Sequence, residues 1–208
     1  MKKVFVLIAA AIVCMSANAQ FQFGAKVGFD MTHFWGKDAP KGFNPNYQVG
    51  LIMEYKFSPT FAIAPEVVFA AQGGKANGTV ENEAIPGITD AVTVKAKGTF
   101  HTNYINVPVM LKLYATPQFS IDFGPQVGFN VYSKMTASGK AASVEAKETI
   151  DLKEATKKVD FGVGLGGTYN LSDNAFVQAR YTLGLINVFE GGGDCKNGNI
   201  QVAFGWKF

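Results

Sequence analysis

The sequence predicts an all-β fold: an eight-stranded antiparallel up-and-down transmembrane β-barrel with long outer loops and short periplasmic turns. The chain begins with an export segment. Apolar and polar residues then alternate with a period of two in eight separate stretches, and the connections between these stretches alternate between long and short. Beyond the export segment no apolar run approaches the ~20 residues of a membrane-spanning helix. Any membrane crossing is therefore expected to use β-strands.

Residues 1–19 have the order of a secretory signal peptide, which is basic, then apolar, then small. The apolar run is about 12 residues long, too short for a membrane helix. Ala17 and Ala19 supply the small side chains of an A-x-A cleavage site. We therefore expect a removed signal peptide over 1–19 and one barrel domain over 20–208. Bulky residues around Cys14 disfavour a lipoprotein site.

The net charge of the mature chain is close to zero. The 19 Lys and Arg fall to 17 once Lys2 and Lys3 leave with the signal, against 16 Asp and Glu. No basic patch indicates nucleic-acid binding. Cys195 is then the single remaining cysteine, which excludes a disulfide within the mature chain.

The first three stretches of alternation are expected as strands at 21–30, 47–57 and 61–72. In the first, aromatic and aliphatic residues occupy the odd positions from Phe21 to Phe29, and small or polar residues occupy the even positions. The second and third repeat this pattern, and a short turn containing proline joins them. Each stretch therefore has one apolar face and one small, polar face.

Five further strands follow by the same criterion. They are expected at 103–114, 119–132, 159–169, 177–183 and 199–208. The fourth and fifth strands alternate aliphatic or aromatic residues with polar ones, the sixth has glycines at alternate positions, and the eighth alternates from Ile200 to Phe208. Strands of about 10 residues, even in number, suffice to cross an apolar band ~25 Å tall when they are tilted.

The lengths of the connections support a membrane barrel. Short turns follow the second, fourth and sixth strands, whereas the other connections are long and polar. These expected loops are 31–46, 73–98, 133–158 and 187–198. With the N-terminus in the periplasm, every long loop falls outside, which is typical of outer-membrane barrels. The bacterial outer membrane is therefore the expected location.

The alternative is a soluble, lipocalin-like barrel, in which the apolar face is turned inward. An eight-stranded barrel has an interior only just wide enough for its side chains, so the aromatic face would overfill it. The small, charged face is therefore expected inside, where its five positive and five negative side chains should pair or form hydrogen bonds. This predicted lumen network consists of Lys26, Asp30, Glu54, Lys56, Glu66, Lys112, Asp122, Asp160, Arg180 and Lys207.

The chain ends on outward-facing aromatic residues. Phe204, Trp206 and Phe208 alternate along the last predicted strand. They resemble the C-terminal signal that the barrel-assembly machinery reads. The alternative interpretation is an ordinary lipid-facing strand end.

Several short motifs occur in a fixed order along the mature chain. They are FGAKVGF at 23–29, YQVGL at 47–51, PEVVF at 65–69, YINVP at 104–108, GPQVG at 124–128, DFG at 160–162 and RYTLGL at 180–185. In order and spacing they resemble the PorT family of eight-stranded outer-membrane barrels. The resemblance implies an outer-membrane location, and some members are linked to protein secretion machinery. Asn106 stands where this family is expected to have an acidic residue.

No motif indicates enzyme chemistry. The glycine-rich run at 162–167 lies within a predicted strand, whereas a dinucleotide loop must open a helix. His33 and His101 have no partner at metal-ligand spacing, and no nucleophile lies in an elbow motif. We expect no catalytic residue, no metal and no cofactor, and we interpret Cys195 as incidental in a flexible, glycine-rich loop.

Two functions stay open at this point. The first is a structural or binding protein with a packed polar lumen and surface-exposed loops. The second is a transport component, either a narrow channel or part of a protein-secretion apparatus. Expected partners are outer-membrane lipid and lipopolysaccharide, the assembly machinery and periplasmic chaperones during biogenesis, and proteins bound through the outer loops.

Overall fold

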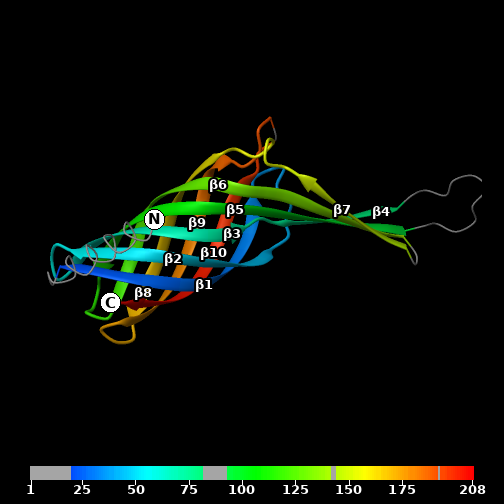
Figure 1. The fold of residues 1–208 in the computed structure, drawn as a ribbon. Helices are drawn as coiled ribbons and strands as arrows, with labels where there is room; N and C mark the ends of the chain where they lie inside the picture. Colours follow the sequence, from blue (N-terminus) through cyan, green and yellow to red (C-terminus); the bar gives the residue numbers. More distant parts are fainter. Residues whose placement is uncertain (1–19, 82–92, 142–143, 192) are drawn as a thin grey trace, which may run out of the picture.

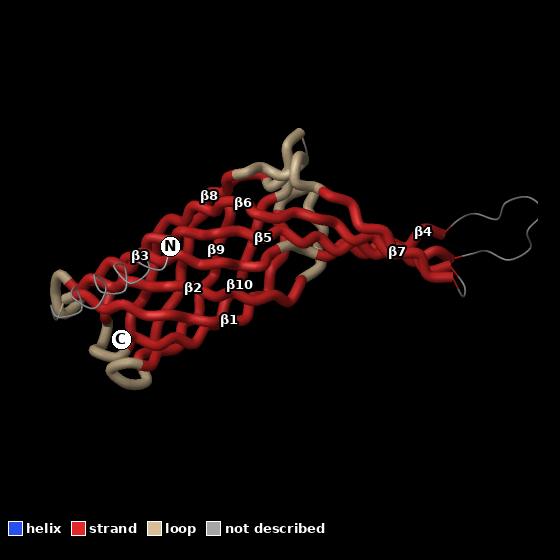
Figure 2. The backbone as a smooth tube through the Cα atoms, in the orientation of Figure 1, coloured by secondary structure: helices blue, strands red, loops and turns tan. Residues whose placement is uncertain are grey.

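The computed structural model describes residues 20–81, 93–141, 144–191 and 193–208, so the predicted signal peptide at 1–19 lies outside the described residues. The regular elements are strands (Figures 1 and 2). They are β1 (Phe21–Trp35), β2 (Asn44–Lys56), β3 (Phe61–Gln72), β4 (Lys75–Glu81), β5 (Thr93–Tyr114), β6 (Phe119–Ala141), β7 (Val144–Asp151), β8 (Val159–Asn170), β9 (Ala175–Asn187) and β10 (Lys196–Lys207). None of the described residues belongs to a helix long and apolar enough to cross a membrane.

A closed antiparallel ring forms the body of the molecule and confirms the predicted fold class. Its order is β1, β2, β3, β5, β6, β8, β9 and β10, and β10 pairs with β1 to close it. That last pairing runs from Gly24 opposite Lys207 to Trp35 opposite Lys196. Because the ring is closed, its strands satisfy one another's backbone hydrogen bonds, as a lipid environment requires.

The short connections share one end of the ring, which we call the short-turn end. The turns after β2, β5 and β8 lie there (Figure 1). Backbone hydrogen bonds from Lys56 N to Gln20 O (2.9 Å) and from Lys207 N to Asn174 O (2.8 Å) tie the first described residue and the last strand to the same end. The opposite end, with the long connections, is called the long-loop end.

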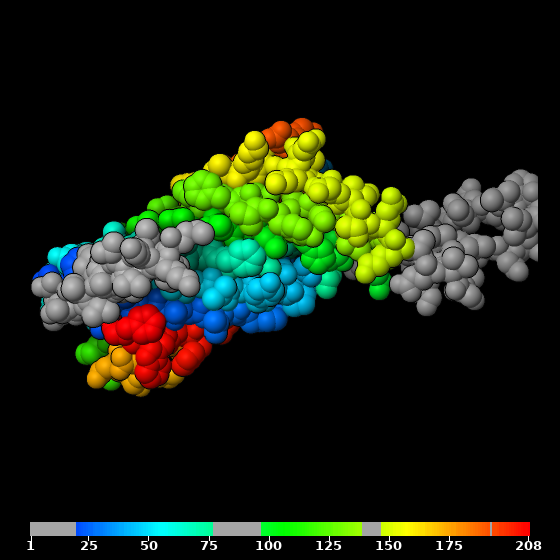
Figure 3. Space-filling view, in the orientation of Figure 1, coloured from blue at the N-terminus to red at the C-terminus, as the bar shows by residue number. Residues whose placement is uncertain are grey.

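Beyond the long-loop end, β5 and β6 continue as the central pair of a four-stranded sheet (Figure 1). Figure 3 shows this part of the molecule projecting from the body. β4 pairs with residues 93–99 of β5, and β7 pairs with residues 134–141 of β6. β5 and β6 stay paired with each other through this region. We call these four segments, 75–81, 93–99, 134–141 and 144–151, the extension.

The structure corrects the predicted loops, because strands enter all four of them. The extension occupies parts of 73–98 and 133–158, and the ends of β1, β2, β9 and β10 enter 31–46 and 187–198. The segments of the extension do alternate, but their less polar positions are often alanine or glycine, because outside the lipid neither face of an antiparallel sheet must be strongly apolar. Residues 82–92 and 142–143 of the expected loops lie outside the described ranges.

The two faces of the ring differ in polarity, since successive side chains of a strand point to opposite sides. The outer face carries exposed aliphatic and aromatic side chains, of which Leu51 is 63% exposed. The inner face carries buried polar and charged side chains such as Lys26 and Asp122. This arrangement excludes the lipocalin-like alternative, which would place the apolar face inside. Exposed rings gather near the short-turn end, as in an interfacial girdle; they are Phe57, Phe61, Phe119, Tyr169, Trp206 and Phe208.

Two glycines are required by close approaches of other groups. Gly73 lies between β3 and β4 with a φ of 138°, a conformation that favours glycine. A Cβ atom there would collide with the carbonyl oxygen of Phe100. Gly205 of β10 lies against the buried ring of Phe176, which a Cβ atom would displace. The first glycine permits the bend toward the extension, and the second makes room for an aromatic ring inside the barrel.

Candidate functional site

The interior of the ring holds the charged residues that the sequence predicts for the lumen. Eight of the ten are at most 4% exposed. They are Lys26, Asp30, Glu54, Glu66, Lys112, Asp122, Arg180 and Lys207. The other two, Lys56 and Asp160, are partly exposed. Hydrogen bonds and ion pairs divide the ten into two groups built around glutamates, a linking aspartate and two separate carboxylates.

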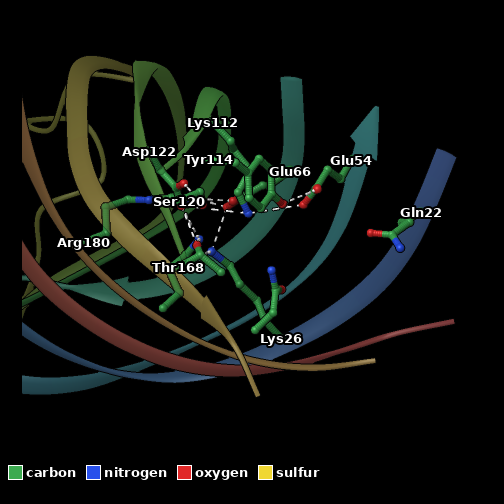
Figure 4. Close-up of polar contacts among 12 residues, drawn as sticks. Gln22, Lys26, Glu54, Glu66, Lys112, Tyr114, Ser120, Asp122, Thr168 and Arg180 are labelled. Atoms are coloured by element: carbon green, nitrogen blue, oxygen red, sulfur yellow. Dashed lines mark hydrogen bonds and ion pairs between the residues drawn. The ribbon is translucent and has the colours of Figure 1, made fainter. Parts of the chain in front are cut away.

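The first group is built around Glu66 of β3 (Figure 4). Arg180 of β9 donates from Nη1 to Oε2 at 3.0 Å and from Nη2 to Oε1 at 2.7 Å. Lys26 of β1 donates to Oε2 at 2.7 Å. β3 and β9 stand opposite each other in the eight-strand ring, so the Arg180–Glu66 pair crosses the full width of the lumen. The bidentate geometry is among the strongest available to side chains.

The second group is built around Glu54 of β2 and lies nearer the short-turn end. Its Oε2 accepts hydrogen bonds from Lys112 Nζ at 3.2 Å and from Lys207 Nζ at 3.3 Å. Its Oε1 accepts a hydrogen bond from the Tyr114 hydroxyl, and Lys56 Nζ lies 3.9 Å from this oxygen. One buried carboxylate thus holds cations from three other positions of the wall together.

Asp122 of β6 links the two groups (Figure 4). Its carboxylate accepts hydrogen bonds from the hydroxyl of Thr168 and from the amide of Gln178, the latter at 3.4 Å. The Nζ of Lys112, from the Glu54 group, lies 4.0 Å from the same carboxylate. Gln178 also accepts a hydrogen bond from Lys26 of the Glu66 group at 2.9 Å. The polar contacts are therefore continuous across the short-turn half of the lumen.

Asp30 and Asp160 lie toward the long-loop end, and no ion pair within the described ranges includes either of them. Asp30 accepts hydrogen bonds from the amides of Gln48 at 2.8 Å and Asn199 at 3.4 Å. Asp160 accepts one from the amide of Asn197 at 2.7 Å. The five negative and five positive side chains of the network are therefore not paired one to one. All five cations lie with the other three carboxylates, Glu54, Glu66 and Asp122.

A small hydrophobic cluster covers the long-loop end of the lumen. Its buried members are Phe34, Val188 and Cys195, and Phe100 and Phe189 pack against them. The ring centroids of Phe34, Phe100 and Phe189 lie 5.7 to 6.0 Å from one another, within the usual range for packed aromatic pairs. We call these five residues the aromatic cap.

Cys195 is part of this cap, although the sequence places it in a glycine-rich loop. Burial raises the pKa of its thiol to about 11, and the carboxylates of Asp194 and Asp38 act in the same direction. Because the thiolate is the reactive form of cysteine, this environment opposes reactivity near neutral pH. The side chain therefore serves packing in this structure.

The short-turn end has a polar recess of about 360 Å³. Gln22, Lys56, Asn170 and Lys207 contribute to its walls. Lys207 Nζ donates hydrogen bonds to the side-chain oxygens of Gln22 and Asn170, both at 3.2 Å, in addition to its bond with Glu54. The two lysines belong to the Glu54 group, so the recess borders the ion pairs that fill the lumen.

Sequence reasoning missed four buried aromatic residues of the interior. They are Phe34, Tyr104, Tyr114 and Phe176. Each lies an even number of positions along the same strand from a predicted lumen residue. Tyr114, for example, follows Lys112 by two positions and donates to Glu54. The phase of the alternation was the signal that could have found them, since it fixes the inner face whatever the residue type.

The aromatic residues at the end of the chain are exposed on the outer face. Phe204, Trp206 and Phe208 alternate with buried inward-facing residues of β10. The backbone N–H of Phe208 donates to the carbonyl oxygen of Phe23 at 2.7 Å, which holds the last residue beside β1. Recognition of these three aromatic residues by the barrel-assembly machinery stays a prediction.

The other motifs considered from the sequence are structural in this chain. The glycine-rich run at 162–167 lies inside β8 and pairs with both β6 and β9, so it does not open a helix. The ring of His33 packs against Phe43, with centroids 4.8 Å apart. Across the described residues, no group of three or more His, Cys, Asp or Glu side chains is placed to hold a metal ion.

The match to a family model agrees with this architecture. The family described as "outer membrane protein beta-barrel domain" matches residues 16–190. Among solved structures, the chain is similar to Ail, the attachment invasion locus protein of Yersinia pestis, with a TM-score of 0.48 and 12% identity over 91% of this chain and 99% of that one. It is also similar to Neisserial surface protein A, with a TM-score of 0.42 and 12% identity over 89% and 97%. No curated protein sequence matches the chain.

Proposed function

The chain belongs to the outer membrane protein beta-barrel domain family, and from that premise we propose that it is a closed outer-membrane anchor of the structural or binding type. It holds the extension and the outer loops at the cell surface. The observation that carries this proposal is the continuity of β5 and β6, which pass from the lipid-facing wall into the extension with one register shift, between Asn103 and Tyr104. Strands fixed in the membrane at one end present the sheet at their other end in a defined orientation.

The packed interior supports an anchor rather than a pore. The Arg180–Glu66 pair crosses the lumen, the Glu54 group fills it nearer the short-turn end, and the aromatic cap covers the other end. Breaking such buried pairs is expensive, because a single charge would be left without a partner. A conducting path would require several of these contacts to open together.

Two finer points are part of the same proposal. The order of the motifs between 23–29 and 180–185 favours a PorT-like member of the family, and a signal peptide over 1–19 would deliver it to the periplasm. Periplasmic chaperones and the barrel-assembly machinery would then receive it, with the exposed Phe204, Trp206 and Phe208 as the recognition signal. Lipopolysaccharide and surface proteins are the proposed partners of the outer loops and the extension.

Conductance in planar bilayers separates this proposal from the alternative of a narrow channel. We expect the refolded mature chain to give no reproducible current at any voltage, while a wide porin inserted in the same way reports successful reconstitution. Discrete and reproducible current steps would contradict the closed anchor. A role in secretion has a separate test, since a deletion strain that retains cargo in its periplasm would favour the transport alternative.

A further inference from the structure

A small polar cavity lies inside the barrel toward the long-loop end. Its volume is about 10 Å³, close to the space that one water molecule or one small ion occupies. Asp160 of β8, Thr182 of β9 and Asn199 of β10 line it, so three consecutive strands of the ring contribute. Thr182 and Asn199 are paired directly across β9 and β10, which places their side chains next to each other on the inner face.

Three oxygen atoms in this wall lack a hydrogen-bond partner among the described residues: Asp160 Oδ1, Thr182 Oγ1 and Asn199 Oδ1. Thr182 is 5% exposed and Asn199 is 2% exposed, so bulk water does not satisfy them. Hydrogen bonds to other residues occupy the second polar atom of Asn199 and of Asp160, so the first, Oδ1, is left without a partner in the described part of the chain. Asn199 donates its Nδ2 to Asp30 at 3.4 Å, and Asp160 uses its Oδ2 to accept from Asn197 at 2.7 Å.

The charge around the cavity distinguishes a cation from a water molecule. Asp160 has no Lys, Arg or His nitrogen within ion-pair distance in the part of the chain that the structure describes. A buried carboxylate is stabilised in its charged form by a cationic or metal partner, and without one it tends to take up a proton. A water molecule would satisfy hydrogen bonds but would leave the charge in place. The free atoms are a carboxylate, an amide and a hydroxyl oxygen, and oxygen donors are those that hard metal cations prefer.

We propose that this cavity binds a single hard metal cation, Na⁺ or Ca²⁺, through Asp160 Oδ1, Thr182 Oγ1 and Asn199 Oδ1. The cation neutralises the carboxylate and ties β8, β9 and β10 together. It thereby gives the long-loop half of the lumen an ionic contact of the kind that Glu54 and Glu66 provide in the short-turn half.

The test uses the full mature chain, refolded in detergent, stripped with EDTA and kept in N-methyl-D-glucamine chloride at constant ionic strength. Titration with CaCl₂ and, separately, with NaCl should raise the urea midpoint of unfolding for the cation that binds, until the response saturates. Calorimetry with that cation should give one site per barrel. The two titrations distinguish Ca²⁺ from Na⁺. Asp160→Asn should weaken binding at least tenfold.

A matched pair of threonine variants controls for the loss of a buried hydroxyl. Thr182→Val removes a proposed ligand and should weaken cation binding, whereas Thr168→Val removes a buried hydroxyl that contacts Asp122 and should leave binding unchanged. Equal midpoints in all three salts would overturn the proposal, as would an equal response in the parent chain and in Asp160→Asn. If Asp160→Asn fails to fold, the comparison of Thr182→Val with Thr168→Val decides.

Discussion

Strands β5 and β6 pass through two regions, the barrel wall and the extension, and the two regions make different demands on the same strand pair. In the wall, residues such as Ile105 and Phe129 face lipid, while Asn106 is buried in the lumen. In the extension, the paired residues Thr99 and Thr136 belong to polar positions, and the positions that alternate with them are mostly small residues such as Gly98 and Ala137. The pairing of β5 with β6 continues into this region after one register shift, between Asn103 and Tyr104. Pairing and alternation are therefore common to both regions, whereas large apolar side chains are frequent only where one face of the strand meets lipid.

The barrel wall and the extension also differ in whether a packed interior lies behind the sheet. The wall has a filled interior of ion pairs and amides, so a change in the lumen removes partners from several strands at once. The extension is a single sheet without such an interior, so a substitution at one of its exposed residues, such as Glu148, removes few contacts. We therefore expect equal substitutions to have unequal costs in the two regions.

The largest effect is expected from removing the carboxylate at the centre of the lumen. Glu66→Ala leaves Lys26 and Arg180 buried without their partner and should lower the free energy of unfolding by about 3–5 kcal/mol. Glu148→Ala, at an exposed position of β7, should stay within about 0.5 kcal/mol. Urea unfolding of the two variants in detergent measures both values. A small cost for both variants would indicate that the lumen is filled with water rather than packed.

A smaller effect is expected on the lipid-facing side of β5. Val107→Arg places a charge in the apolar band and should cost about 2–4 kcal/mol if the position is near the bilayer midplane. Thr136→Arg on the extension part of β6 should be close to neutral, because its surroundings are water. Reversible unfolding in lipid vesicles compares the two. If Thr136→Arg cost as much as Val107→Arg, the boundary between wall and extension would be misplaced.

The smallest effect concerns chemistry rather than stability, at the cap between the two regions. Because burial raises the pKa of the Cys195 thiol to about 11, little thiolate is present near pH 8. Iodoacetamide should therefore modify Cys195 roughly a hundredfold more slowly than an exposed cysteine introduced by Thr149→Cys in a Cys195→Ala background. The rate at Cys195 should rise as the pH is raised toward this pKa. Equal rates at pH 8 would show that the cap is open.

Prediction from the sequence succeeded where lipid enforces a pattern. The odd and even faces from Phe21 to Phe29 follow directly from alternation, and so does the inner position of Lys26. The extension escaped prediction because residues 93–99 and 134–141 alternate between polar residues and mostly small ones, a weaker pattern than the aromatic and aliphatic face of the wall. Strand pairing there is visible only from the backbone.

The identity of the ion pairs was likewise beyond the sequence. Lys26 and Asp30 are close on the same strand, yet Lys26 pairs with Glu66 instead. Arg180 and Glu66 are 114 residues apart and meet only because β3 and β9 face each other in the ring. The height of each side chain along the barrel axis decides its partner, and that height depends on the register between strands. Cys195 illustrates the same limit, since loop composition did not reveal that it packs beneath aromatic rings.

In the proposed arrangement, a closed barrel holds the extension outside the cell and the short turns in the periplasm. Labelling of intact cells with a membrane-impermeant maleimide tests it directly, with Thr149→Cys on β7 and Asp173→Cys in the turn after β8, each in a Cys195→Ala background. Both positions are exposed in the structure, so the membrane alone decides access. We expect Thr149→Cys to be labelled on intact cells and Asp173→Cys only after the outer membrane is permeabilised. The opposite pattern, or labelling of both on intact cells, would contradict this arrangement.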